Sequence, residues 1–416
     1  MKFVADFHLH SKYSRATSQE MNLENLDKWA QIKGIKVLGT GDFTHPEWFK
    51  ELKEKLKEEE RGLFKLKGGH SETRFILTTE ISCVYSKGGK VRKIHIILFA
   101  PSFEVVEKIN AHLGWVGNLK ADGRPTLGLD AKELAKIILS ISSDCLIVPA
   151  HIWTPWFSLF GSRSGFDSLE ECFEEYSEHI FAGETGLSSD PAMNWRVSAL
   201  DKITLISNSD SHSPSRIGRE ANVFDAALDY FSILEAIKKK DKEKLLYTIE
   251  FYPEEGKYHY DGHRLCNIRM SPEESKKTGG ICPNCGKPLT IGVLNRVEQL
   301  ADRPEGFVPQ KAIPFKRLVP LEEIIAQALN VNKVAKQVRR DYQNLIKIFG
   351  SEFNILLSVS KEDLEKVAGP KIAEGVIRAR EGRVIAEPGY DGVYGKIRVF
   401  GEEKENHPSF GQKTLF

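Results

Sequence analysis

Short apolar stretches alternate with helix-like patterns along residues 1–220. Seven of these stretches have the length of strands: residues 2–7, 35–40, 75–84, 94–99, 145–149, 180–182 and 204–207. Between several of them, a helical pattern appears at residues 22–33, 46–60, 104–112, 131–140, 168–174 and 193–200. Repetition of strand and helix predicts a parallel α/β barrel or a doubly wound sheet.

The pattern changes after residue 240, which predicts further domains. Residues 228–240 read as a basic amphipathic helix, whereas residues 250–320 are rich in Gly, Pro and Cys with little period. A helical pattern returns at residues 321–383, and the end from residue 401 is polar. We therefore predict an α/β unit at residues 1–235, a small cysteine-containing module at 236–320, a helical domain at 321–400 and a flexible tail at 401–416.

Composition narrows the class of protein without defining it. The 416 residues suit two or three domains, and 59 Lys and Arg against 58 Asp and Glu leave a net charge of +1, so overall charge does not indicate a nucleic-acid partner. No stretch approaches the roughly 20 apolar residues of a membrane helix, and the N-terminus lacks a signal peptide, so we expect a cytoplasmic protein without membrane attachment. Three of the six cysteines cluster late, which favours a metal site over a disulfide framework.

Polar residues recur just past the predicted strands, where parallel barrels build their active sites. The segment Asp6-Phe7-His8-Leu9-His10 has the alternation of a strand, so its carboxylate and two imidazoles share one face. A core rarely accommodates such groups unless each has a hydrogen-bond partner or an ion. The candidate metal ligands are His8, His10, Asp42, Glu80, His95, His151, Glu184, Asp210 and His212.

This set of ligands favours metal-dependent hydrolysis. Histidine with carboxylate suits zinc, manganese or iron, and magnesium fits carboxylate-rich positions. So many ligands in one mouth predict two or three ions, an arrangement suited to in-line displacement at phosphorus. A single His, such as His45 or His112, is more often a satisfied core group, but the joint pattern is hard to obtain by chance.

These motifs also carry a resemblance to a known family. They are Asp6-x-His8-x-His10, Thr40-Gly41-Asp42, Thr79-Glu80-Ile81, His95-Ile96-Ile97-Leu98, Pro149-Ala150-His151 and Asn208-Ser209-Asp210-Ser211-His212. Together they resemble the polymerase and histidinol phosphatase (PHP) family. The resemblance implies a distorted seven-stranded βα barrel, a trinuclear metal centre at its mouth and hydrolysis of phosphate esters or phosphodiesters. Asp42 stands where many relatives have His, and a further His is missing near Arg15, so the third ion is expected to be weak or absent.

A second metal site is predicted in the cysteine-containing module. His263-x-x-Cys266 and Cys282-x-x-Cys285 provide four N and S ligands, the set of a structural zinc ion. Cys282 and Cys285 could instead form a redox pair, and His259 competes with His263 for the fourth position. Cys83, Cys145 and Cys172 lie in apolar stretches and are predicted to be buried core thiols.

The helical end offers a candidate DNA contact. Residues 367–373 lie between two short helical patterns and resemble a helix-hairpin-helix, in which Gly369 and Lys371 would present backbone N–H groups and positive charge to a phosphate. An ordinary α-hairpin with a solvated basic face is the alternative. Residues 412–416, Gln-Lys-Thr-Leu-Phe, resemble the start of a sliding-clamp binding box, although a chance match to so short a string is equally expected.

The order of these parts resembles the archaeal endonuclease Q family over nearly the whole chain, with similar blocks at residues 115–125, 184–191 and 259–264. The resemblance implies a DNA repair endonuclease that cuts on the 5′ side of a deaminated base (uracil, hypoxanthine or xanthine) and at abasic sites. Such a base must leave the stack to be inspected. We expect Asp210, His8 and Glu80 to be essential for catalysis. Loop residues predicted to contact the substrate are Asn118, Arg124, Asn194 and Trp195.

Other functions remain open from the sequence alone. A small-molecule phosphatase of the histidinol-phosphate type would need neither the zinc module nor the hairpin. A DNA- or clamp-binding scaffold with an inactive barrel, or a glycosylase that releases the free base, would also use some of these parts. Zn²⁺ is the expected structural ion and is also expected at the active site, where Mg²⁺ or Mn²⁺ could serve instead.

Overall fold

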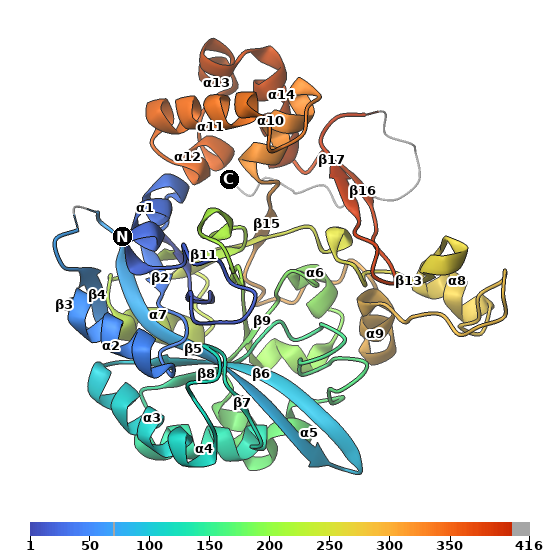
Figure 1. Ribbon diagram of the computed structural model, residues 1–416. Coiled ribbons are helices and arrows are strands. Elements are labelled where there is room, and N and C mark those ends of the chain that lie inside the picture. Colours follow the sequence, from blue (N-terminus) through green and yellow to red (C-terminus); the bar gives the residue numbers. More distant parts are fainter. Residues whose placement is uncertain (70, 402–416) are drawn as a thin grey trace.

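The computed structural model describes residues 1–69 and 71–401 (Figure 1). Seven strands form a ring at its centre. Ladders join β1 to β2, β2 to β5, β5 to β6, β6 to β8, and β9 to β10. The ring continues from β8 to β9 through the hydrogen bond from Ile152 N to Glu184 O, and from β10 to β1 through a bridge between Leu9 and Ser211. These strands are β1 (Lys2–Asp6), β2 (Val37–Gly39), β5 (Arg74–Lys87), β6 (Lys90–Ala100), β8 (Leu146–Pro149), β9 (Ala182–Glu184) and β10 (Thr204–Ile206).

The ring is a mixed sheet, so the expectation of purely parallel strands is wrong. β1, β2 and β5 run parallel, but β6 is antiparallel to both β5 and β8. The reason lies in the connection between β5 and β6, which is only Gly88 and Gly89, both with positive φ. So short a turn makes a hairpin, because a parallel crossover needs a dozen residues or more.

Further strands extend the sheet beyond the ring. β11 (Ala221–Asp225) pairs with β1 and is followed by β12 (Leu245–Glu250) and β15 (Phe315–Arg317). On the other side, β5 pairs with β4 (Leu63–Leu66), which pairs with β3 (Leu56–Glu60), and also with the short β7 (Thr126–Leu127). The predicted helix at residues 46–60 is therefore too long: α2 ends at Lys55, because residues 56–60 pair with β4 instead.

Helices surround the ring (Figure 1). Several of them begin directly after a residue whose side chain caps the helix. The side chains of Asn22, Ser102, Asp130 and Asp229 each accept a hydrogen bond from a backbone N–H of the first turn. The helices are α1 (Leu23–Lys33), α2 (Pro46–Lys55), α3 (Phe103–Val116), α4 (Ala131–Ile141), α5 (Leu169–Phe173), α6 (Pro191–Asn194) and α7 (Tyr230–Lys238). Inside the ring, Phe7 packs against Phe99 and Phe224, with ring centroids 5.3 and 6.1 Å apart.

The cysteine-containing segment projects from the side of the ring in Figure 1. It contains β13 (Asp261–His263), β14 (Ile268–Met270), α8 (Pro272–Lys277) and α9 (Val293–Leu300). The hairpin of β16 (Ile385–Glu387) and β17 (Lys396–Arg398) contacts this segment, since Gly389 O accepts from Tyr260 N and Asp391 accepts from Arg264 N and Thr290 Oγ1. The segment is therefore tied to the C-terminal end of the described chain.

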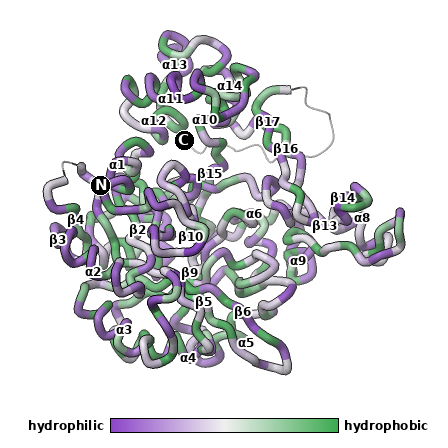
Figure 2. The backbone as a smooth tube through the Cα atoms, viewed as in Figure 1, coloured by the Kyte–Doolittle hydropathy of each residue, from purple (hydrophilic) through white to green (hydrophobic). Residues whose placement is uncertain are grey.

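A helical domain packs on α1. It comprises α10 (Leu321–Leu329), α11 (Lys336–Phe349), α12 (Glu352–Leu357), α13 (Lys361–Ala368) and α14 (Pro370–Arg380). The buried Glu352 carboxylate lies 2.6 Å from Lys33 Nζ of α1 and also accepts from Tyr342 Oη. Apolar and polar stretches alternate along the helices in Figure 2, and within the described residues no helix is long and apolar enough to cross a membrane. The predicted clamp-binding residues 412–416 lie outside the described residues.

Candidate metal centre

Side chains from successive strands converge at one mouth of the ring. His8 and His10 follow β1, Glu80 and His95 lie within β5 and β6, and His151 follows β8. Asp42, His151 and Asp210 have φ values of 49°, 30° and 46°. Non-glycine residues rarely adopt this left-handed conformation, which concentrates at functional sites.

The first ligand group is His8, His10, Glu80 and Asp210, whose ligand atoms lie within 4.8 Å of one another. His10 Nε2 is 3.1 Å from Asp210 Oδ1 and 3.3 Å from Glu80 Oε2, and His8 Nε2 is 3.5 Å from Glu80 Oε2. His8 Nε2 is buried without a hydrogen-bond partner among the described residues. A buried nitrogen of this kind, aimed at two carboxylates, fits a metal ligand.

The second group is Glu80, His95 and His151. Glu80 Oε1 lies 2.8 Å from His95 Nδ1 and 3.1 Å from His151 Nε2, whereas Glu80 Oε2 faces the first group. Glu80 therefore bridges the two groups with separate oxygens. Imidazole and carboxylate donors in this arrangement could hold two neighbouring ions.

Two predicted ligands have a different place in the structure. Asp42 Oδ1 is 3.0 Å from His10 Nδ1, and Asp42 Oδ2 accepts from Ser11 N, Ser11 Oγ and Ser14 Oγ. Glu184 lies 3.0 Å from His8 Nδ1. Each carboxylate thus contacts the imidazole nitrogen opposite the one that faces the ligand group, as supporting carboxylates do in metal sites. Asp42 and Glu184 therefore position His10 and His8, and they lie outside both ligand groups.

His212, the remaining predicted ligand, lies at the rim. Its ring centroid is 4.6 Å from that of His10, and its Nδ1 donates to Asp210 O. It belongs to neither ligand group; its side chain is one-third exposed, and its Nδ1 is turned to the backbone. The structure brings six of the nine predicted ligands together: His8, His10, Glu80, His95, His151 and Asp210.

Sequence reasoning missed the polar residues that hold the supporting carboxylates. Ser11 and Ser14 bind Asp42, and Asn208 donates to Glu184 Oε1 while it accepts from Phe7 N. Their only signal in the sequence is their position within or just after the ligand motifs. Asp6 likewise lies outside both ligand groups, because its carboxylate accepts from Ser209 N and Gly218 N.

The electrostatics of the centre favour bound cations. Burial lowers the pKa of His8, but the carboxylates of Glu184 and Glu80 outweigh it and raise the pKa well above its ordinary value. Burial raises the pKa of Glu80, but His95 and His8 outweigh it, so the pKa of Glu80 falls well below its ordinary value. Arg124 offsets part of this negative charge, with Nη1 3.1 Å from Glu80 Oε2. The raised pKa of His8 means that the neighbouring carboxylates stabilise a positive charge at its ring. A metal ion bound there would replace the proton, because metal binding releases protons from its ligands.

The residues predicted to contact the substrate are spread over several places. Arg124 lies on Glu80, and Asn118 lines a pocket between α2 and α3. Asn194 is fully buried and accepts from Trp153 Nε1 at 2.7 Å, so it anchors the core and does not line a base pocket. Trp195 packs edge-on against Phe315.

Two further predicted substrate contacts lie in the helical domain. Gly369 separates α13 from α14 with φ 81°, and an added Cβ there would meet nothing within 4 Å. Lys371 is exposed in the first turn of α14.

The cysteine-containing segment holds a third ligand group: His263, Cys266, Cys282 and Cys285. His263 Nδ1 is 3.5 Å from Cys285 Sγ, whereas the alternative, His259, is buried elsewhere against Tyr260. Burial raises the pKa of Cys282, but backbone N–H groups of Asn284 and Cys285 outweigh it and lower the pKa to about 7. A lowered pKa increases the fraction of thiolate, which is the form that binds metal. Four N and S donors match a structural zinc site.

The fold and the adjoining ligand groups define a metal-dependent phosphoester hydrolase. A family model described as the MJ0043 C-terminal domain matches residues 320–383, the region of α10 to α14. The uncharacterized protein MJ0043 of Methanocaldococcus jannaschii is 35% identical over 256 residues, which are 59% of this chain and 31% of that protein, so the match spans about a third of that relative. The uncharacterized protein YqxK of Bacillus subtilis is 30% identical over 416 residues, covering 95% of this chain and 99% of that protein.

Two solved structures match along nearly the whole chain. The lesion-specific endonuclease PfuEndoQ from Pyrococcus furiosus is 32% identical with a TM-score of 0.86, covering 96% of this chain and 95% of that one. Endonuclease Q in complex with a 27-mer duplex bearing an abasic lesion at the active site is also 32% identical, with a TM-score of 0.84 and 96% of both chains covered. The chain belongs to the endonuclease Q family, and it is an enzyme of the endonuclease class.

Proposed function

We propose that the protein is a metal-dependent DNA repair endonuclease that hydrolyses the phosphodiester on the 5′ side of deaminated bases (uracil, hypoxanthine or xanthine) and at abasic sites. The observation that carries this proposal is the pair of ligand groups bridged by Glu80 in a chain that aligns with endonuclease Q over 96% of its length. The relative that was solved with duplex DNA had an abasic lesion at its active site. That complex supports damaged DNA as the substrate class here.

The residues of the centre have separable roles in this proposal. His8, His10 and Asp210 would hold one ion, His95 and His151 another, and Glu80 would contact both. Bound divalent ions, Zn²⁺, Mn²⁺ or Mg²⁺, supply Lewis acidity for in-line displacement at phosphorus. Asp42 and Glu184 keep the imidazoles of His10 and His8 in place. Arg124, held on Glu80 by an ion pair, brings a fixed positive charge to the mouth, where a DNA phosphate would lie.

Selection of damaged bases is proposed to use base flipping. A base that pairs poorly leaves the stack at lower cost, which favours lesions over normal pairs. Arg124 is the predicted substrate residue nearest to the ligand groups.

The outer parts of the chain are proposed to hold the duplex. A Cβ at Gly369 would meet none of the described residues within 4 Å, which leaves room for a phosphate at the first turn of α14, and Lys371 adds charge there. The cysteine-containing segment at residues 261–300 would depend on a structural zinc ion held by its four ligands. Binding of a sliding clamp through residues 412–416 stays a prediction.

The test is a cleavage assay on end-labelled duplex DNA with one deoxyuridine, resolved at single nucleotides. We expect a nick directly 5′ to the deoxyuridine with Mg²⁺ or Mn²⁺, no nick with chelator, and no nick in a matched thymidine duplex. Asp210→Asn and His8→Ala should abolish cleavage while DNA binding, measured by fluorescence anisotropy, survives. Release of phosphate from small phosphomonoesters without any cut in lesion duplexes would place the protein in the phosphatase class instead.

A further inference from the structure

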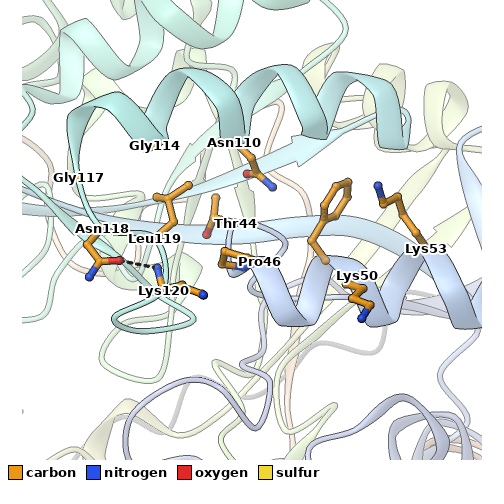
Figure 3. A pocket seen from close by; sticks show the side chains of 11 residues that line it. Thr44, Pro46, Lys50, Lys53, Asn110, Gly114, Gly117, Asn118, Leu119 and Lys120 are labelled. Atoms are coloured by element: carbon orange, nitrogen blue, oxygen red, sulfur yellow. Dashed lines mark hydrogen bonds between the residues drawn. The ribbon is translucent and has the colours of Figure 1, made fainter.

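A cavity of about 520 Å³ lies between α2 and α3, apart from the three ligand groups (Figure 3). Phe49 of α2 and Leu119, just beyond α3, form apolar walls, and Asn110 of α3 contributes an amide. This volume falls within the range of pockets that bind small organic groups, and a mixture of apolar walls with a few polar groups is typical of them.

A glycine keeps one wall of this pocket bare. Gly114 lies inside α3, where glycine destabilises a helix relative to alanine. A Cβ added to Gly114 would meet no atom of residues 1–69 or 71–401 within 4 Å, so packing within this part of the chain does not require the glycine. The bare backbone is explained if another molecule approaches α3 at this point, since glycine permits close contact with a ligand.

The charges and polar groups of the pocket fit a nucleotide. Lys50, Lys53 and Lys120 line it, and none of the described lining residues is acidic. Lys53 pairs with Glu107 at 2.7 Å and Lys50 lies 4.0 Å from Glu54, whereas Lys120 has no ion pair among the described residues. These ammonium groups suit a phosphate.

The side-chain amide of Asn110 makes one hydrogen bond through its nitrogen and none through its oxygen among the described residues. Asn110 Nδ2 donates to Phe43 O, which fixes the amide, and Asn110 Oδ1 is buried without a partner in the described part of the chain. Because this oxygen is covered in the free protein, it can accept from the N–H of a nucleobase only when the Asn110 side chain turns toward the pocket.

Residues next to the pocket lining in the sequence include an exposed aromatic residue, Trp115, and a residue of the metal centre, Asp42. Trp115, next to Gly114, is 93% exposed, which is unusual for so large an apolar side chain. At the other end, Thr44 lines the pocket two residues after Asp42, whose Oδ1 is 3.0 Å from His10 Nδ1. DNA placed on the metal centre would therefore pass close to the pocket.

We propose that this pocket receives an unpaired nucleotide of the bound DNA, a neighbour of the lesion and not the lesion itself. Its base would lie against Phe49 and Leu119, its phosphate would face the lysines, and Trp115 would stack on an adjacent base, as aromatic side chains do in single-strand binding. The inference rests on the proposed function, because it requires DNA at the metal centre.

The test compares Gly114→Ala and Trp115→Ala in an Asp210→Asn background, with a fluorescein-labelled duplex that carries one abasic site. We expect Gly114→Ala to raise Tm by about 1–2 °C, because alanine favours the helix, and yet to weaken DNA binding about tenfold by narrowing the pocket. Trp115→Ala should weaken binding by about five- to hundredfold, the range for loss of base stacking. Gly128→Ala is the matched control, since an added Cβ there also meets nothing within 4 Å.

Photocrosslinking with 5-iododeoxyuridine at each position around the lesion then identifies the occupant. A crosslink to Trp115 from a nucleotide beside the lesion supports the proposal. Binding by both variants within twofold of the parent, or crosslinks to Trp115 only from nucleotides that are not adjacent to the lesion, overturns it. If the pocket proposal fails but the wild-type protein cuts lesion duplexes, the proposed function is unaffected. If the wild-type protein cuts no lesion duplex, the proposed function is refuted as well.

Discussion

Replacement of Asp42 by asparagine tests whether this carboxylate positions His10 or binds metal itself. In the structure, one Asp42 oxygen faces His10 Nδ1 and the other accepts three hydrogen bonds from Ser11 and Ser14. An asparagine amide must turn its NH₂ group either toward His10 or toward the serine donors, so one of these contacts is lost. Partners of this kind typically contribute 10–100-fold in metal affinity, or roughly 1.4–2.7 kcal/mol.

The assay is calorimetric titration of the metal-free protein with Mn²⁺, together with cleavage rates over the same concentrations. For Asp42→Asn we expect the same number of bound ions as in wild type, a Kd raised by about 10–100-fold, and cleavage largely restored at saturating Mn²⁺. Glu178→Gln, a change at an exposed carboxylate, should leave both measurements unchanged. Loss of one bound ion in Asp42→Asn would refute the positioning role and make Asp42 a ligand.

Three further perturbations test other parts of the structure. Cys282→Ser should remove one zinc ion per chain and the hydrogen-exchange protection of residues 261–300, because the module depends on its ion; unchanged zinc content would contradict the third ligand group. Burial raises the pKa of Glu250 to about 8 in the folded chain, above its value in the unfolded chain, so the free energy of unfolding should fall as pH rises from about 4.5 to 8. In urea titrations at pH 5 and pH 8, Glu250→Gln should reduce this loss of stability. An unchanged pH dependence in the variant would count against the raised pKa. Lys33→Met leaves the Glu352 carboxylate buried without its ion-pair partner and should destabilise the docked helical domain by roughly 3–5 kcal/mol, whereas Lys28→Met on the exposed side of α1 should have little effect in the same urea titration.

Much of the fold could be predicted because it follows from local pattern. Each of the seven predicted strands overlaps a strand of the ring, and α1, α3, α4 and α7 begin within two residues of their predicted starts. The errors occur where pairing with distant residues decides the structure. Residues 56–60 could continue α2 by their own propensity, but pairing with β4 makes them a strand. The antiparallel placement of β6 also depends on a two-residue turn that the pattern of apolar residues did not reveal.

The sequence by itself determined which residues are candidates for the metal centre. Period-two alternation and the ends of strands place His8, His10, Glu80, His95, His151 and Asp210 toward one mouth, so their convergence could be predicted. Only the tertiary structure decided which carboxylates face the ligand groups. Asp42 and Glu184 occupy the same kind of strand-end position as the ligands, but contacts with Ser11, Ser14 and Asn208 turn them toward the outer nitrogens of His10 and His8. Because those contacts join residues far apart in the chain, local sequence could not distinguish a ligand from its support.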